Sequence, residues 1–146
     1  MKLSDVIGAD DVVLGLRGND IAGAAAKLLE QTLPKHGLPH EEVQRLIDKV
    51  VSREKEMPTT CGTGAIPHAR DAAITSFIAA IGINPDGIIE GKRQPRVIIA
   101  FLSPESQRNE HLAFLASLSR IVSSAEKTDA IARAATAADV VALLQG

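Results

Sequence analysis

The sequence predicts an α/β fold in which helices cover both faces of a β-sheet. Two stretches, residues 73–83 and 96–102, are nearly continuous apolar runs. Central strands have this composition when both of their faces are covered. Apolar residues spaced as in helices precede and follow these runs and supply the covering layers. A chain of 146 residues with 45% hydrophobic content is long enough to form one domain with a substantial core.

The first half of the chain predicts one strand and two helices. Residues 11–16, Asp-Val-Val-Leu-Gly-Leu, are expected to form the strand. Asn19 is the expected N-cap of a helix that runs to about residue 33 and ends at Pro34 and Gly37. Pro39 opens the second helix. The apolar stripes of the two helices are Ile21, Ala24, Ala25, Leu28 and Leu29, and Val43, Leu46, Ile47, Val50 and Val51.

The second half predicts the two apolar strands and three further helices. Turn sequences at residues 84–87 and 91–95 separate the strands. A helix follows the loop that begins at Ser103, and shorter helices are expected at residues 125–134 and 140–144, the last opened by a Thr136–Asp139 capping box. The first of these helices is expected to turn Leu112, Leu115, Leu118 and Val122 inward.

Composition excludes several classes of function. The chain has three Phe and neither Trp nor Tyr, which leaves almost no aromatic surface for stacking on nucleic-acid bases. Its net charge of −2 argues against a broad phosphate-backbone footprint. A single cysteine, Cys61, excludes an internal disulfide and a CxxC zinc motif. Without a signal peptide or a long apolar run, the sequence predicts a cytoplasmic protein that binds no nucleic acid and meets a membrane only through a partner.

The stretch from Arg53 to Arg70 gathers glycines, hydroxyls, arginines and one histidine in a single connection. Pro67 restricts its own φ and favours extended geometry at Ile66, so His68 is expected at the stiff end of a short strand. An imidazole has a pKa near neutrality. Three roles therefore remain open for His68: a nucleophile that attacks phosphorus, a metal ligand, or an ordinary histidine bonded to a backbone carbonyl.

Four residues of this stretch are candidate phosphate-binding residues. Gly62 and Gly64 permit the tight backbone of an anion-cradling loop, and Thr59 and Thr60 place hydroxyl donors beside it. No Gly-Lys-Ser/Thr follows the glycines and the G-x-G-x-x-G spacing is absent, so the loop is neither a nucleotide P-loop nor a dinucleotide fingerprint.

Arg53 and His111 are the other candidate site residues. Arg53 lies on or beside the apolar stripe of its helix and can reach inward; alternatively it only complements the helix dipole. Glu54 either orients Arg53 or is simply exposed. His111 falls in the first turn of a helix, where a histidine can donate to a phosphoryl group or serve only as a surface cap. His36 and His40 are expected to be solvated.

Taken together, these motifs carry a family resemblance. Arg53-Glu54, Pro58-Thr59, the string Gly-Thr-Gly-Ala-Ile-Pro-His-Ala-Arg and His-Leu-x-x-Leu-Ala at 111–116 occur in one order. The chain thereby resembles the mannitol/fructose-type (type 2) enzyme IIA domain of the bacterial phosphoenolpyruvate-dependent sugar phosphotransferase system, which includes the nitrogen-regulatory kind. The resemblance implies one domain over residues 1–146, with a mixed sheet of about four to five strands flanked by helices.

The resemblance also implies a mechanism. His68 would be the phosphoryl acceptor, with His111 and Arg53 stabilising the phosphoryl group and with no metal or other cofactor. The donor would be a phosphohistidine carrier protein, and the acceptor a IIB-type sugar-transporter domain or a regulatory target. The sequence decides neither between transport and regulation nor which sugar is involved.

Two alternatives and one departure accompany the resemblance. A non-catalytic interaction domain could retain the fold, although the joint presence of Arg53, His68 and His111 argues against it. A metal site at His68 and His111 lacks a ligand pair at helical spacing. The chain is one residue shorter than the family pattern between Arg53 and His68. We expect the glycine loop to absorb this deletion, because a shift within the strand would turn His68 to the wrong face.

Overall fold

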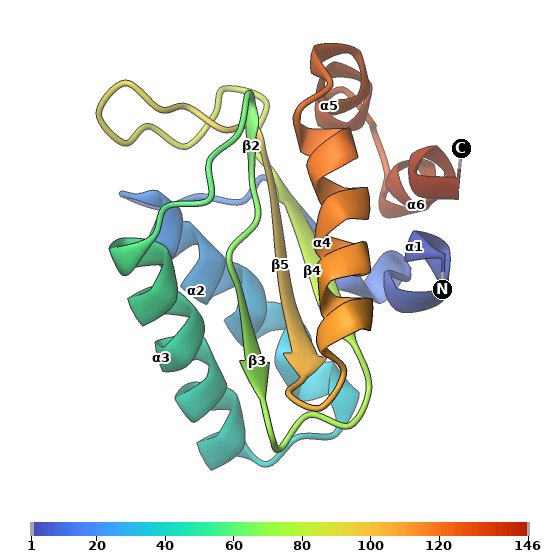
Figure 1. The fold of residues 1–146 in the computed structure, drawn as a ribbon. Coiled ribbons are helices and arrows are strands. Elements are labelled where there is room, and N and C mark those ends of the chain that lie inside the picture. The colour runs from blue at the N-terminus through green and yellow to red at the C-terminus, as the bar shows by residue number, and fades with distance from the viewer. Residues whose placement is uncertain (1, 146) are drawn as a thin grey trace.

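A five-stranded mixed sheet separates two layers of helices in the computed structural model, which describes residues 2–145 (Figure 1). Its central pair is β4 (Ile78–Ile83) and β5 (Val97–Pro104), which run antiparallel. On the outer side of β4 lies the parallel strand β1 (Val12–Leu14). Beside β5 lie β2 (Gly64–Ala65) and β3 (His68–Asp71), both parallel to it. The predicted α/β class with a mixed sheet is confirmed.

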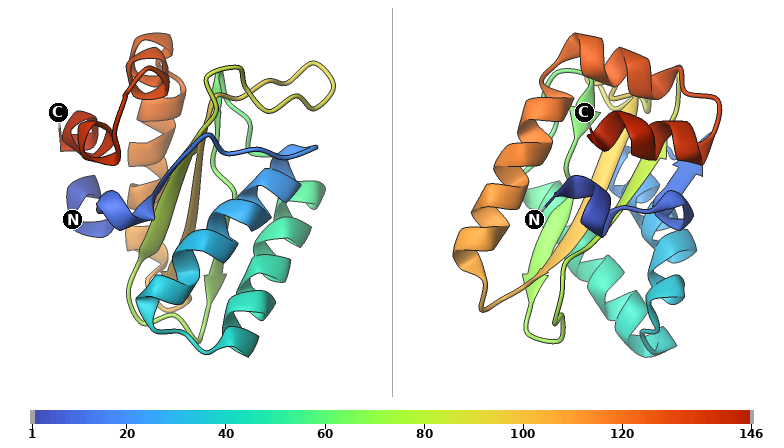
Figure 2. Two further views of the ribbon diagram at one scale, coloured as in Figure 1. Left: turned by 180° about the vertical axis from the view of Figure 1, so that it is seen from behind. Right: turned by 90° about the vertical axis from the view of Figure 1, so that its right-hand side faces the viewer.

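The helices of residues 21–56 cover one face of the sheet, and the helices of residues 108–145 cover the other (Figures 1 and 2). The first layer contains α2 (Ile21–Thr32) and α3 (His40–Glu56), joined by the 3-10 turn η2 (Leu33–His36). The second contains α4 (Arg108–Val122), α5 (Ala125–Ala132) and α6 (Ala137–Gln145). The short elements α1 (Leu3–Val6) and η1 (Ala9–Asp11) complete this layer beside α6. No helix within residues 2–145 is long and apolar enough to cross a membrane.

The two short strands β2 and β3 form one interrupted edge of the sheet. Gly64 pairs with Val97 and His68 with Phe101, so the same register holds on both sides of Ile66 and Pro67. Because side chains alternate along an extended strand, Ile66 and His68 face the α4 layer while Ala65 and Ala69 face α3. The register is therefore continuous from Gly64 to His68, and it fixes the face to which His68 points.

A tight turn precedes this edge. The backbone groups of Cys61 and Gly64 bond to each other, with N···O distances of 2.8 and 3.1 Å, and Gly62 has a φ of 57°. Glycine occupies that left-handed conformation without the steric cost that a Cβ brings. Gly62 thus allows the chain to turn tightly just before the edge strand.

Several sequence predictions need correction. The N-cap of α2 is Asp20, whose carboxylate accepts from the amide of Gly23 at 2.6 Å, and not Asn19. The run 73–83 becomes a strand only at Ile78, because Asp71 accepts the amide of Ala73 at 2.8 Å and turns the chain. His36 is not merely solvated, since its Nε2 lies 2.8 Å from Asp11.

The apolar stripe of α4 is also displaced from its predicted position. The helix buries His111, Phe114, Leu118, Ile121 and Val122, whereas Leu112 is 52% exposed. These buried residues recur at three and four, and His111 starts the pattern. Because the first buried residue of the helix is a polar histidine, the apolar pattern alone assigned the wrong face of the helix to the core.

Candidate active site

His68 is held by its own backbone and by an aromatic ring. It is the first residue of β3, half-buried, and its ring stacks on Phe101 with centroids 4.9 Å apart and planes 8° from parallel. Nδ1 lies 2.7 Å from the carbonyl oxygen of Ile66. A carbonyl oxygen can only accept, so Nδ1 carries the proton and Nε2 carries the free electron pair. The structure thus fixes both the orientation and the tautomer of the ring.

Burial lowers the pKa of His68 below its usual 6.5, the bond to Ile66 opposes this shift, and the nearby Arg53 adds to it. The ring is therefore neutral near pH 7. A neutral imidazole with a free Nε2 is a competent nucleophile.

His111 lies against His68 from the opposing helix. The two ring centroids are 5.3 Å apart, and His111 is only 7% exposed. Burial, followed by the nearby charges of His68, Arg70 and Arg53, lowers the pKa of His111 to about 4. His111 is thus also neutral near pH 7.

Ser103 sets the orientation of His111. Its hydroxyl, fully buried at the end of β5, lies 2.6 Å from Nδ1 of His111. Within residues 2–145 the hydroxyl has no other hydrogen-bond partner, so its proton goes to Nδ1. The Nε2 of His111 then carries the ring proton and is a hydrogen-bond donor.

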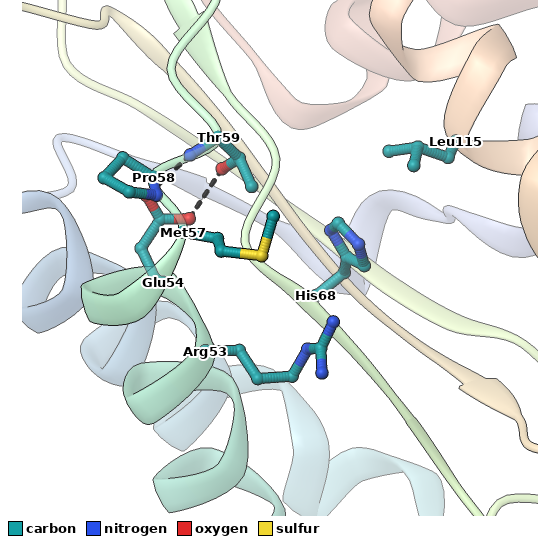
Figure 3. Close-up of a pocket in the computed structure, with 7 residues that line it drawn as sticks. All are labelled: Arg53, Glu54, Met57, Pro58, Thr59, His68 and Leu115. Atoms are coloured by element: carbon teal, nitrogen blue, oxygen red, sulfur yellow. Dashed lines mark hydrogen bonds between the residues drawn. The ribbon is translucent and has the colours of Figure 1, made fainter.

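Arg53 brings a cation to the same place. It lies in the last turn of α3, and its guanidinium extends beside the His68 ring (Figure 3). Among the described residues this guanidinium has no hydrogen-bond or ion-pair partner, which leaves its donors available to a ligand. Arg53, His68 and His111 thus converge from α3, β3 and α4.

A pocket of about 250 Å³ opens beside Arg53 and His68. It is lined by Arg53, Glu54, Met57, Pro58, Thr59, His68 and Leu115. Met57 is 73% exposed at its rim. The pocket is large enough for a phosphoryl group and is open to an approaching protein.

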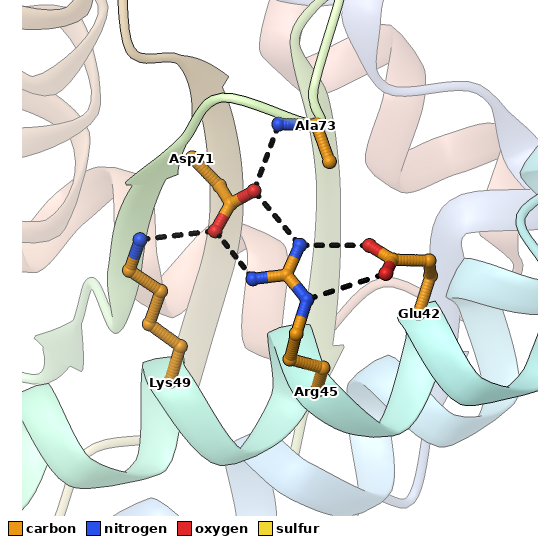
Figure 4. Close-up of polar contacts among 5 residues, drawn as sticks. All are labelled: Glu42, Arg45, Lys49, Asp71 and Ala73. Atoms are coloured by element: carbon orange, nitrogen blue, oxygen red, sulfur yellow. Dashed lines mark hydrogen bonds and ion pairs between the residues drawn. The ribbon is translucent and has the colours of Figure 1, made fainter.

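An ion-pair network keeps α3 at a fixed position along β3 (Figure 4). The buried Asp71 carboxylate accepts two bonds from Arg45, at 2.8 and 2.9 Å, and one from Lys49 at 3.0 Å. These cations hold the pKa of Asp71 well below its usual range. Because Asp71 follows His68 on the same strand and Lys49 lies one helical turn before Arg53, the network sets where Arg53 meets His68.

The predicted phosphate-binding residues are not all at the pocket. Thr59 lines it, but its hydroxyl donates to Glu54 at 2.6 Å and accepts from the amide of Ile66 at 2.9 Å. The Thr60 hydroxyl is buried with no partner among the described residues, outside the lining. Gly62 and Gly64 lie at the other end of the edge against Val122, about 13 Å of extended chain from His68 in the case of Gly64. The structure gives both glycines a role in the turn and in packing.

Sequence reasoning missed two contributors to the site, Ser103 and Phe101, and assigned the wrong role to a third, Glu54. Ser103 directly follows the apolar run 96–102, and a polar residue at the end of such a run is a candidate site residue. Phe101, within that run, gave no signal beyond its place in the core. Glu54 is 4% exposed and accepts from Thr59, so neither expectation for it, orienting Arg53 or being exposed, is correct.

Residues 2–145 contain no group of three or more His, Cys, Asp or Glu side chains that could hold a metal ion. The fold and site define an α/β domain that presents a neutral, tautomerically fixed histidine in an open pocket beside a free guanidinium. That arrangement is suited to group transfer between proteins.

The chain belongs to the EIIA 2 family of the phosphoenolpyruvate-dependent sugar phosphotransferase system, whose family model matches residues 9–146. A nitrogen regulatory protein of Pseudomonas aeruginosa is 30% identical over 122 residues, which cover 79% of each chain. The family predicted from the sequence motifs is confirmed.

Solved structures show the same fold. The nitrogen regulatory protein IIA-Ntr of Neisseria meningitidis superposes with a TM-score of 0.80 at 22% identity, covering 97% of this chain and 98% of that one. IIA mannitol of Escherichia coli gives 0.76 at 24% identity, with coverage of 94% and 98%. The Escherichia coli complex of IIA mannitol with phosphorylated IIB gives 0.75 at 23% identity, with coverage of 94% and 96%.

Proposed function

We propose that this chain is a cytoplasmic phosphocarrier that accepts a phosphoryl group on Nε2 of His68 from a phosphohistidine carrier protein. The observation that carries the proposal is the 2.7 Å bond from Nδ1 of His68 to Ile66, which leaves Nε2 of this pocket-lining ring unprotonated. The family to which the chain belongs supports the same chemistry.

In the transfer step, the P–N bond of the donor breaks as a P–Nε2 bond forms on His68. The electron pair of the broken bond returns to the donor imidazole. The proton on Nδ1 stays in place, and its bond to Ile66 strengthens as the His68 ring becomes positively charged. Because both sides of the reaction are P–N bonds, the protein's task is mainly to position the groups and stabilise charge.

Arg53 and His111 would stabilise the phosphoryl oxygens. Arg53 presents a planar fork of donors that matches phosphate geometry. His111 offers one N–H from Nε2, because Ser103 occupies its other nitrogen. Because His111 is a neutral hydrogen-bond donor, it adds no positive charge that would hold the phosphoryl group back when this group moves to the next protein.

Exposed apolar residues around the pocket provide a surface for the partner proteins. Met57, at the pocket, is 73% exposed, and Leu115 also lines the pocket. Leu112, three residues before Leu115 on α4, is 52% exposed. Interfaces commonly have an apolar, Met-containing centre with a charged rim. The donor, which brings a phosphorylated side chain to His68, and the acceptor, which brings an unphosphorylated one, would cover these residues in turn.

The acceptor would be either a IIB-type domain or a regulatory target. The mannitol IIA complex with phosphorylated IIB favours the first, and the nitrogen regulatory relative, at 30% identity, favours the second. Both roles use the same His68 chemistry. Loss of chemistry, as in a non-catalytic interaction domain, finds no support in a site that keeps Arg53, His68 and His111 together.

Phosphorylation in vitro tests the proposal. The protein is incubated with phosphoenolpyruvate and the general phosphotransferase proteins, and its intact mass is measured before and after acid treatment. We expect an acid-labile gain of one phosphate in wild type and none in His68→Gln, with His111→Gln labelled more slowly. Equal labelling of His68→Gln would remove His68 from its assigned role.

A further inference from the structure

The edge of the sheet at Ile66 carries two backbone groups with no strand to pair with. The carbonyl of Pro67 accepts from the amide of Phe101 at 3.1 Å, so this residue faces β5. In an extended strand the backbone N–H and C=O groups of neighbouring residues point in opposite directions. The N–H and C=O of Ile66, which precedes Pro67, therefore point away from β5. Side chains take both groups: Thr59 the amide and His68 the carbonyl.

Thr59 is itself fixed by Glu54. The carboxylate of Glu54 accepts from the Thr59 hydroxyl at 2.6 Å and from the Thr59 amide at 3.0 Å. A hydroxyl has one proton to donate, and Thr59 donates it in a hydrogen bond to Glu54. The hydroxyl oxygen can then only accept a further hydrogen bond, and the amide of Ile66 supplies the donor. Four hydrogen bonds thus run from Glu54 through Thr59 and Ile66 to Nδ1 of His68. Figure 3 shows the part of this chain between Glu54 and Thr59.

Glu54 occupies an unfavourable position for a carboxylate. It is 4% exposed and lies near the C-terminal end of α3, where the helix dipole favours cations. Burial raises its pKa, and the bonds from Thr59 oppose that shift. Burying an acid at this position is unfavourable for packing. The two hydrogen bonds from Thr59 are the feature that accounts for it, so we assign Glu54 the role of holding Thr59.

We infer that Glu54 and Thr59 are positioning residues of the phosphoryl-transfer site: they hold the Ile66 backbone so that its carbonyl keeps the proton of His68 on Nδ1. The inference rests on the proposed function, because the tautomer matters to transfer only if Nε2 is the acceptor atom. Both residues line the pocket, but the Thr59 hydroxyl donates to Glu54 and accepts from Ile66, so neither side chain has a donor left for the phosphoryl group. Without them the Ile66 segment loses its tether, and His68 can adopt the tautomer in which Nε2 is protonated and unreactive.

The test combines nitrogen-15 NMR of the His68 ring with the rate of labelling from the phosphorylated donor. Wild type is expected to show the Nδ1–H tautomer. Thr59→Val removes the hydroxyl and should give a mixture of tautomers, a roughly tenfold lower kcat and an unchanged KM for the donor. Thr59→Ser retains the hydroxyl and should restore both readouts. Glu54→Gln removes one acceptor and should give an intermediate result.

Thr63→Val is the matched control. Thr63 lies in the same loop, and its hydroxyl pairs with Thr128 at 2.5 Å, away from His68. This variant should leave the tautomer and the rate unchanged. If Thr59→Val fails to fold, Glu54→Gln, compared with Thr63→Val, still tests the inference.

Two outcomes would separate the inference from the function on which it rests. If wild type is labelled at His68 while Thr59→Val and Glu54→Gln keep the wild-type nitrogen shifts and rate, the positioning role is refuted and the phosphocarrier stands. If wild type is not labelled but Thr59→Val shifts the tautomer, the phosphocarrier is refuted and the tether stands.

Discussion

Lowering the pH from 7 to 5 should destabilise the fold through His111. Burial holds the pKa of His111 at about 4 in the folded chain, against 6.5 for a free histidine. Below pH 6.5 the unfolded chain therefore gains a proton at this position, and the folded chain does not until about pH 4. Stability conferred by the neutral ring is thus present above pH 6.5 and is lost as the pH falls. Integration over this range gives about 2 kcal/mol lost between pH 7 and pH 5.

Two other groups titrate near this range. His68 acts in the same direction, because its pKa is also lowered by burial. Glu54 acts in the opposite direction, because its pKa is raised and the folded chain takes up its proton first. Asp71, whose pKa is lowered from 3.8, contributes only at lower pH. Comparing wild type with His111→Gln removes the contributions that both proteins share.

The assay is urea unfolding followed by far-ultraviolet circular dichroism, because the chain has no Trp or Tyr for fluorescence. We expect the pH-dependent loss to be about 2 kcal/mol smaller in His111→Gln than in wild type. His40→Gln, which replaces an exposed histidine, is the control and should retain the wild-type slope. If His111→Gln shows the same slope as wild type, His111 is not a buried neutral group.

Three further perturbations test other parts of the structure. Arg53→Lys should slow phosphoryl transfer roughly tenfold without changing the urea midpoint, because a point charge replaces a fork; an unchanged rate would make Arg53 structural. Asp71→Asn should cost about 1–3 kcal/mol in urea unfolding. That is less than for a fully buried pair, because the Arg45 side chain is 46% exposed; a neutral result would show that the network does not hold α3. Gly64→Ala places a Cβ 2.5 Å from that of Val122 and should cost about 1–3 kcal/mol, whereas unchanged stability would show that α4 can move aside.

The sequence predicted what local pattern and motif order can specify. The apolar runs located β4 and β5, the stripes located α2 and α3, and the Ile-Pro-His string placed His68 at the end of a short strand, which is β3. The predicted meeting of Arg53 with His68 agrees with the structure, because Val50 and Leu46 fix the face of α3 that turns inward.

What the sequence could not show depends on contacts between distant segments. Burial of Glu54 requires the loop at Thr59 to fold back over the end of α3, and the role of Ser103 requires α4 to place His111 above it. Leu112 was misplaced because the buried stripe of its helix begins with a histidine. No local pattern distinguishes the hydroxyl of Thr59, already bonded on both sides, from one that is free to bind phosphate.

The most direct test of the central claim is to locate the phosphoryl group by nitrogen-15 and phosphorus-31 NMR on the phosphorylated protein. The account predicts phosphorus bonded to Nε2 of His68, with the proton retained on Nδ1. Phosphorus on Nδ1 of His68, or on His111, would contradict the assignment of Nε2 as the acceptor atom. It would also contradict the role given to Glu54 and Thr59 in keeping Nε2 unprotonated.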